Sequence, residues 1–320
     1  MPRGAKIVVA GGAGFIGSSL VRRLAADGVN VRATTHASPP RVHDKRVEYV
    51  KADLTQKADC ERIVKGMDCV FMCAAVTSGA GVIASDPLAH VTSNLIMNAL
   101  MLEASYRARV KKFVWISSNV VYPPSGRRPV REDQSLARGP YEAYFASGWM
   151  KRYTEILCRL YSEKLKAPMP AVVLRPSNIY GPFDKFDPES SHVTAALVRK
   201  VCERENPIVV WGDGRDVRDV LYIDDFVEAL VLAAEKMGGY DPINVAFGRG
   251  YTVRAILKTL LEIDGRADAR VVYDRSKPSM IPVRLLDTSK AEKLLGFRAK
   301  TSLREGLSKT VDWYKATHAG

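Results

Sequence analysis

In the first thirty residues, apolar side chains first form a continuous run and then recur at helical spacing. Residues 7–10, Ile-Val-Val-Ala, form a short run rich in β-branched side chains, which predicts a buried β-strand. After a glycine turn, one face of the next segment is apolar and carries Ile16, Leu20, Val21 and Leu24. This spacing is typical of an amphipathic helix. The chain therefore begins with a strand, a turn and a helix.

Strand-like and helix-like segments continue to alternate. Five further apolar runs predict strands, at residues 30–36, 47–54, 68–76, 111–118 and 170–177. Such alternation is typical of parallel strands joined by right-handed crossovers. We expect an α/β protein with a Rossmann-type doubly wound parallel sheet formed by residues 1–175, to which residues 215–237 return. Residues 176–320 are expected to form mainly a smaller α/β substrate-binding lobe.

The turn after the first strand carries Gly11, Gly14 and Gly17. The first glycine permits a tight turn, the second lets backbone N–H groups approach a pyrophosphate, and the third lets the helix pack on the strand. Between a strand and a helix, this triplet predicts a dinucleotide site. Ligands of doubly wound sheets bind at the carboxyl ends of the strands. The side chains at these ends are those of Asp53, Ala74, Ala75, Ser117, Ser118 and Asn178.

The end of the second strand favours NADP over NAD. A carboxylate there would bind the adenosine ribose diol, but the strand ends in Thr35 and His36, and Arg41 and Lys45 follow. A 2′-phosphate would therefore meet no negative charge at this position. Arg41 also fits a solvated loop cation, so NAD stays open as the alternative cofactor.

Composition excludes several classes of protein. The 320 residues are 47% hydrophobic and 26% charged, as in a soluble globular protein. The net charge is +13, but the cations are scattered among 35 acidic residues, which favours small anionic ligands over nucleic acid. The five cysteines match no metal spacing and are expected to be buried free thiols. Without a signal-peptide pattern or an apolar run long enough to span a membrane, we expect a cytoplasmic protein.

Several longer motifs occur in the order typical of one family. They are "ADL" at 52–54, "CAA" at 73–75, "SSNVVYP" at 117–123, "RPSNIYGP" at 175–182, "WGDGRDVRDVLYIDDF" at 211–226 and "PVRLLDTSKAEKLLGF" at 282–297. Over essentially its whole length the chain resembles the extended short-chain dehydrogenase/reductase family, which acts on nucleotide sugars. Within it, "FDPESSHVTAALVRK" at 186–200 is most similar to GDP-fucose synthase-like epimerase/reductases.

The resemblance implies an NAD(P)-dependent reductase or epimerase that transfers a hydride at the C4 of a GDP- or other NDP-4-keto-6-deoxyhexose. The alternatives are a 4-epimerase with tightly bound NAD and a catalytically impaired nucleotide-sugar-binding protein. The cofactor is expected to contact Gly11, Gly14, Phe15, Ile16, Gly17, Thr35, His36, Arg41, Asp53, Leu54, Ala74, Ala75, Lys151, Pro176 and Asn178. The sugar nucleotide is expected to contact Ser118, Asn119, Asn178, His192, Lys200, Trp211, Arg218 and Arg284.

The catalytic helix departs from the family's Tyr-x-x-x-Lys motif. In relatives a glutamate follows the lysine by four residues and an aromatic by ten, and Glu155 and Tyr161 lie at these distances from Lys151. Lys151 then matches the motif lysine, and Ser147 stands where relatives have tyrosine. A phenol suits proton transfer when a nearby ammonium favours its ionised form. We therefore predict Tyr144, one turn earlier, as the proton donor beside Ser118 and Lys151.

Two alternatives to this assignment remain. Ser147 can be an altered tyrosine, or another group can have taken over proton transfer while Tyr144 and Tyr141 only line the pocket. His192 matches a histidine acid of fucose synthases, but the expected cysteine at position 120 is Val120, which puts 3,5-epimerisation in doubt.

Relatives dimerise through four-helix bundles. A homodimer through residues 94–108 and 144–165 is therefore expected.

Overall fold

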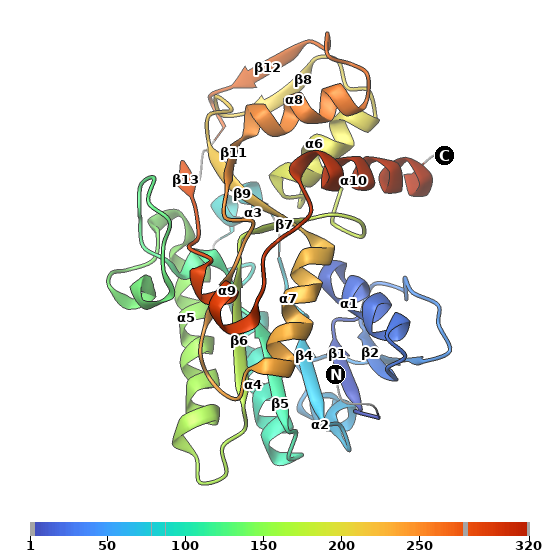
Figure 1. Cartoon of the computed structure of the whole chain (residues 1–320), viewed down its shortest axis with the longest axis vertical. Coiled ribbons are helices and arrows are strands. Elements are labelled where there is room, and N and C mark those ends of the chain that lie inside the picture. Colours follow the sequence, from blue (N-terminus) through green and yellow to red (C-terminus); the bar gives the residue numbers. More distant parts are fainter. Residues whose placement is uncertain (1–3, 78, 87, 278–280, 319–320) are drawn as a thin grey trace.

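The computed structural model describes residues 4–77, 79–86, 88–277 and 281–318. Its larger lobe is built on a seven-stranded parallel sheet with the order β10-β6-β5-β4-β1-β2-β3 (Figure 1). The strands are β1 (Ile7–Ala10), β2 (Val31–Thr35), β3 (Val47–Lys51), β4 (Cys69–Met72), β5 (Lys112–Ile116), β6 (Ala171–Pro176) and β10 (Ile243–Val245). The predicted doubly wound sheet is confirmed.

Helices cover both faces of this sheet. α1 (Phe15–Ala26) packs on α7 (Ile223–Lys236) on one face. On the other face α4 (Thr92–Arg107) lies between α2 (Lys57–Val64) and α5 (Phe145–Arg159). Alternate residues of β1 enter two separate apolar cores, Ile7 and Val9 in one and Val8 and Ala10 in the other. This division follows from the two-residue period of a strand that is buried on both faces.

The smaller lobe contains two further sheets. In one, β9 (Val217–Tyr222) pairs with β7 (Asn178–Tyr180), β11 (Gly250–Thr252) and β13 (Val283–Arg284). In the other, β8 (Ile208–Trp211) pairs with β12 (Val271–Asp274). The helices α6 (Val193–Cys202), α8 (Val253–Ile263) and α10 (Leu303–His318) pack together beside them (Figure 1).

Two short helices lie elsewhere. α9 (Ser289–Leu295) packs on α7 and β10 of the larger lobe, and α3 (Ala80–Ser85) follows the loop after β4. Short helical segments also run over Asn119–Val121, Glu132–Leu136, Glu142–Tyr144 and Leu160–Lys164.

The return of the chain to the larger lobe differs from the predicted range 215–237. β9 lies inside that range but belongs to the smaller lobe, because its hydrogen-bonding edges are occupied by β7, β11 and β13. The return begins with α7 at Ile223 and extends past 237 to β10, which pairs with β6 through Ile243 and Leu174.

Candidate active site

The glycine turn between β1 and α1 has the geometry of a dinucleotide cradle. Gly11 has φ +79°, and a Cβ placed on it would lie 2.7 Å from the Ala74 backbone. A Cβ on Gly17 would lie 2.0 Å from the carbonyl oxygen of Gly11, so neither position accepts a side chain. Gly14 precedes α1 without a side-chain cap, which leaves the N–H groups at Phe15 and Ile16 for a ligand. These residues fit the pyrophosphate of a dinucleotide.

The part of the site that is predicted to bind the adenosine of the dinucleotide is formed by the loops after β2 and β3. Asp53 accepts hydrogen bonds from the backbone and hydroxyl of Thr55, which lower the pKa of its carboxyl group. Arg41 donates to the carbonyl oxygen of Phe183 at 2.6 Å, so its guanidinium links this loop to the segment after β7. Thr35 ends β2 and His36 directly follows it, while Leu54 is buried.

The predicted nicotinamide side lies at the ends of β4 and β6. Ala74 packs on Gly11, and Ala75 follows it. Pro176 ends β6, and its carbonyl oxygen accepts a hydrogen bond from Asn119 at 3.3 Å. Asn178 lies opposite Val220 where β7 joins the smaller lobe. The sheet thus brings these predicted residues to one edge.

Lys151 lies at the same edge. Its Nζ donates to the carbonyl oxygen of Ile116 at 2.9 Å and is 4.6 Å from the centre of the Trp115 ring. Burial lowers the pKa of the Lys151 ammonium to about 8, although the negative charge of Glu155 opposes this shift. Directly after β5, Ser117 leads to Ser118, whose Oγ accepts a hydrogen bond from the N–H of Val120.

Close packing fixes the register of α5. A Cβ on Gly148 would lie 2.5 Å from the Pro140 side chain and 2.9 Å from the carbonyl oxygen of Val120. No lysine side chain therefore fits at position 148. This packing supports the interpretation in which Lys151 is the lysine of the motif and Ser147, one turn before it, stands at the tyrosine position, and that interpretation stays a prediction.

Tyr144 faces the smaller lobe. It precedes α5 as its N-cap residue, and burial raises the pKa of its phenol, while the charges of Arg218 and Arg284 lower it. Ser147 donates from Oγ to the carbonyl oxygen of Tyr144 at 3.3 Å. This position fits the alternative in which Tyr144 lines the substrate pocket, and its assignment as proton donor stays a prediction.

Arg218 and Arg284 form a cation pair near Tyr144. Arg284 is only 3% exposed, donates to the carbonyl oxygens of Pro123 and Tyr122, and leaves its Nε without a partner among the described residues. Burial lowers the pKa of Arg284 to about 10. Arg218 pairs with Asp216 at 3.0 Å. A buried guanidinium with a spare N–H is suited to a phosphate oxygen.

Other predicted substrate residues lie in the smaller lobe. His192 precedes α6 and remains exposed to solvent. Partial loss of hydration together with the charges of Lys185 and His90 lowers the pKa of its imidazole. Lys200 donates to the carbonyl oxygen of Val209 at 2.8 Å, so its ammonium is held against β8. Trp211 is 47% exposed at the end of β8.

Sequence reasoning missed a buried polar network behind the site. Arg175 donates from Nε and Nη2 to the two carboxylate oxygens of Glu155, at 2.8 and 2.5 Å. Ser117 donates to the same carboxylate at 2.6 Å, and Arg175 also donates to the hydroxyl of Tyr122, which donates to Asn244. The network joins α5 to the ends of β5 and β6. The glutamate four residues after Lys151 and the arginine before Pro176 were the available signals.

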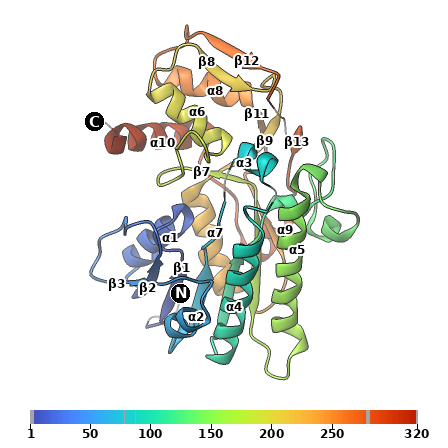
Figure 2. The same cartoon turned by 180° about the vertical axis from the view of Figure 1, so that it is seen from behind.

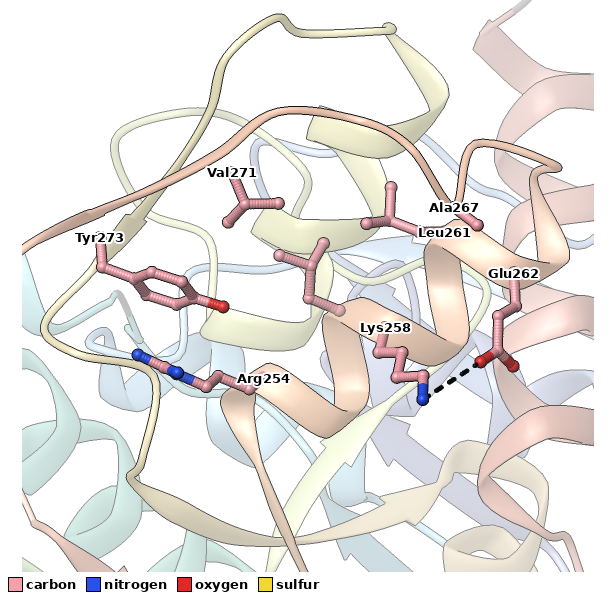
Figure 3. A pocket seen from close by; sticks show the side chains of 8 residues that line it. Arg254, Lys258, Leu261, Glu262, Ala267, Val271 and Tyr273 are labelled. Atoms are coloured by element: carbon pink, nitrogen blue, oxygen red, sulfur yellow. Dashed lines mark ion pairs between the residues drawn. The ribbon is translucent and has the colours of Figure 1, made fainter.

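A separate pocket of about 190 Å³ lies between α8 and β12 (Figure 3). There the guanidinium of Arg254 lies 4.2 Å from the Tyr273 ring centre. No predicted site residue lines this pocket, and we attach no chemistry to it. Among the described residues, no group of three or more His, Cys, Asp or Glu side chains is arranged to hold a metal ion, and no helix is long and apolar enough to cross a membrane. All five cysteines are free, and Cys73 and Cys202 are only half-buried.

Comparison with known proteins identifies the class. Residues 7–246 match the model of the NAD dependent epimerase/dehydratase family, and the chain belongs to this family of enzymes. It is 31% identical to GDP-L-fucose synthase 1 of Arabidopsis thaliana, with 98% of this chain and 94% of the relative covered. It is 30% identical to a dTDP-4-dehydro-6-deoxy-D-allose reductase of a Streptomyces species, with 98% and 97% covered.

The fold is also shared with a solved enzyme. The structure of a UDP-glucose 4-epimerase with UDP-glucose from Thermotoga maritima matches with a TM-score of 0.87 and 31% identity, over 98% of this chain and 99% of that one.

Proposed function

We propose that this enzyme reduces or epimerises a nucleotide sugar by hydride transfer at the sugar C4, with a GDP- or other NDP-4-keto-6-deoxyhexose as substrate. The observation that carries the proposal is the buried Arg284, whose Nε has no partner among the described residues, together with Arg218, since the charges of both arginines act on the Tyr144 phenol. Two such guanidinium groups can chelate a diphosphate. The sugar would then extend towards Ser118 and Lys151.

The remaining site residues take the parts that the family resemblance gives them. The glycine turn would hold the dinucleotide, with Thr35, His36 and Arg41 favouring NADP because they present no carboxylate to a 2′-phosphate. Asn119, Asn178, His192 and Trp211 would surround the sugar nucleotide. The bound dinucleotide would supply or accept the hydride. Lys200 is the weakest member of this set because its ammonium is already held at β8.

A second candidate function is a 4-epimerase that keeps NAD bound. The similarity to the Thermotoga maritima UDP-glucose 4-epimerase favours it. In that case oxidation and reduction alternate at C4, and no dinucleotide is consumed.

We also propose that two copies associate through α4 and α5 in a four-helix bundle. These helices lie side by side (Figure 2). Exposed apolar side chains follow one face of α5 at helical spacing and continue into the segment directly after it, namely Phe145, Trp149, Tyr153, Ile156 and Leu160, and Ile96 on α4 is exposed as well. A stripe of this size on one helix is unusual on a free surface. We expect the enzyme to work in the cytoplasm, where free thiols persist.

The experiment that tests the function begins by denaturing the purified protein and identifying any released dinucleotide. Retained NAD supports the 4-epimerase, whereas an empty protein that binds NADPH more tightly than NADH supports the reductase. GDP- and dTDP-4-keto-6-deoxyhexoses are then offered with NADPH. An Arg284→Lys variant is expected to bind the sugar nucleotide at least about tenfold more weakly, because lysine lacks the planar fork. Equal binding by this variant would contradict the placement of the diphosphate.

A further inference from the structure

The unusual feature of the site is that a serine replaces the tyrosine of the motif, one turn before Lys151. Residues four apart lie on the same helix face, so Ser147 and Lys151 point to the same side of α5. The contact of Gly148 with Pro140 and Val120 prevents a shift of this register. The phenol of a tyrosine at position 147 would therefore have lain directly beside the Lys151 ammonium.

Tyr144 does not take that place. Lys151 lies seven residues further along, roughly 10 Å along the helix axis. The charges that act on the Tyr144 phenol are those of Arg218, Arg284 and Asp216, all from the smaller lobe. A phenol next to the diphosphate-binding cations is suited to bind phosphate.

Lys151 has the features of a proton-exchanging group. Of its three ammonium protons, one is donated to the carbonyl oxygen of Ile116, next to Ser117 and Ser118 in the chain. The groups packed around it are the Trp115 ring on β5, and Glu155 and Cys158 on its own helix. Glu155 is in turn neutralised by Arg175 of β6. Little negative charge is therefore left to hold the proton on Lys151.

We propose that the Lys151 ammonium itself exchanges the proton at the sugar C4 oxygen, in the space that the small Ser147 side chain leaves where relatives have a tyrosine ring. The inference rests on the proposed function. In the reduction, a bound dinucleotide would supply the hydride to the carbonyl carbon, and the carbonyl π electrons would form an O–H bond with a proton from the Lys151 ammonium. Lys151 is left as a neutral amine and regains its proton from water.

The pKa of Lys151, lowered by burial to about 8, suits this task, since a group that titrates near the working pH is an efficient acid. Lysine must be protonated to act as the acid. The reduction rate is therefore expected to fall as the pH rises through about 8.

The first test needs no substrate. The protein is treated with trace acetic anhydride from pH 6 to 11, and acetylation of Lys151 is compared by mass spectrometry with that of Lys258, whose side chain is 80% exposed. We expect a midpoint for Lys151 near pH 8, about two units below the reference for lysine. A midpoint near pH 10 would overturn the proposal. Because no turnover is needed, this result stands even if the proposed function fails.

The second test separates proton transfer from binding. Arginine keeps the positive charge but does not release its proton. Lys151→Arg is therefore expected to lower kcat at least about 100-fold, while the Kd of the dinucleotide rises less than about tenfold. The matched control is Lys258→Arg, at an exposed ammonium on α8, which should keep kcat within about threefold. A loss of kcat of about 100-fold in Tyr144→Phe would assign the proton to Tyr144 instead and overturn the proposal.

Discussion

The buried ion pair between Glu155 and Arg175 is expected to stabilise the larger lobe strongly. The two side chains are 4% and 2% exposed, and two hydrogen bonds join them. Burial lowers the pKa of Arg175, but the hydrogen bonds and charge of Glu155 outweigh this effect and raise it overall. In Glu155→Gln the guanidinium would keep its charge in a buried place without a counter-ion.

The magnitude follows from this burial. Removing one partner of a buried pair costs about 3–5 kcal/mol, because the remaining charge is left uncompensated. Glu155→Gln should lower the free energy of unfolding by this amount. The control is Glu103→Gln, which breaks the exposed pair of Glu103 with Arg107 on α4, 2.7 Å apart with side-chain exposures of 34% and 65%. That change should cost less than about 0.5 kcal/mol.

Urea denaturation followed by circular dichroism and by tryptophan fluorescence measures both variants. Trp115 packs between Lys151 and the Asn98 side chain, so fluorescence reports on the affected region. Coincidence of the two signals is required before a free energy is derived. A loss below about 1 kcal/mol in Glu155→Gln would refute the reasoning, since it would mean that water or a rearranged partner compensates Arg175.

Three further predictions follow from the packing, the exposed stripe and the buried acid. Gly17→Ala places a methyl group 2.0 Å from the carbonyl oxygen of Gly11 and should abolish dinucleotide binding in a fluorescence titration. Gly139→Ala, with open space around it, should bind the dinucleotide normally. Equal binding by the two variants would contradict the role of the glycine turn as a dinucleotide cradle. Trp149→Glu should convert the dimer to a monomer in light scattering. Leu136→Glu, at a side chain that is 67% exposed, should leave the dimer intact. A dimer in both variants would place the interface elsewhere. Burial raises the pKa of Asp184 to about 7, so the stability that its protonated form contributes is lost as the pH rises through 7. Asp184→Asn should therefore raise the free energy of unfolding, measured by urea titration, by up to about 4 kcal/mol at pH 8 and by less at pH 5. No gain at pH 8 would show that neighbouring groups compensate the charge of the carboxylate.

The sequence predicted the features that depend on local periodicity. Strands such as residues 7–10 and the glycine turn follow from short patterns, and the structure has both. The surroundings of Tyr144 could not be predicted in this way. The helix pattern shows that it lies near Lys151 in the chain, but the charges around its phenol come from Arg218 and Arg284, on strands far along the sequence.

The same reason explains two other differences. Glu155 and Arg175 were visible as single polar residues, yet their pairing depends on how α5 packs on β6. β9 looked like part of the chain's return to the larger lobe because it directly precedes α7. Only its pairing with β7, β11 and β13 assigns it to the smaller lobe.

The central claim is that this enzyme transfers a hydride at the C4 of a nucleotide sugar. Its most direct test supplies NADPH deuterated at the transferable C4 position, together with a GDP- or dTDP-4-keto-6-deoxyhexose, and locates the deuterium in the product by NMR. The account predicts deuterium at the sugar C4 and nowhere else on the ring. A protein that binds both ligands but leaves no deuterium on the sugar, and that releases no bound NAD on denaturation, would contradict it.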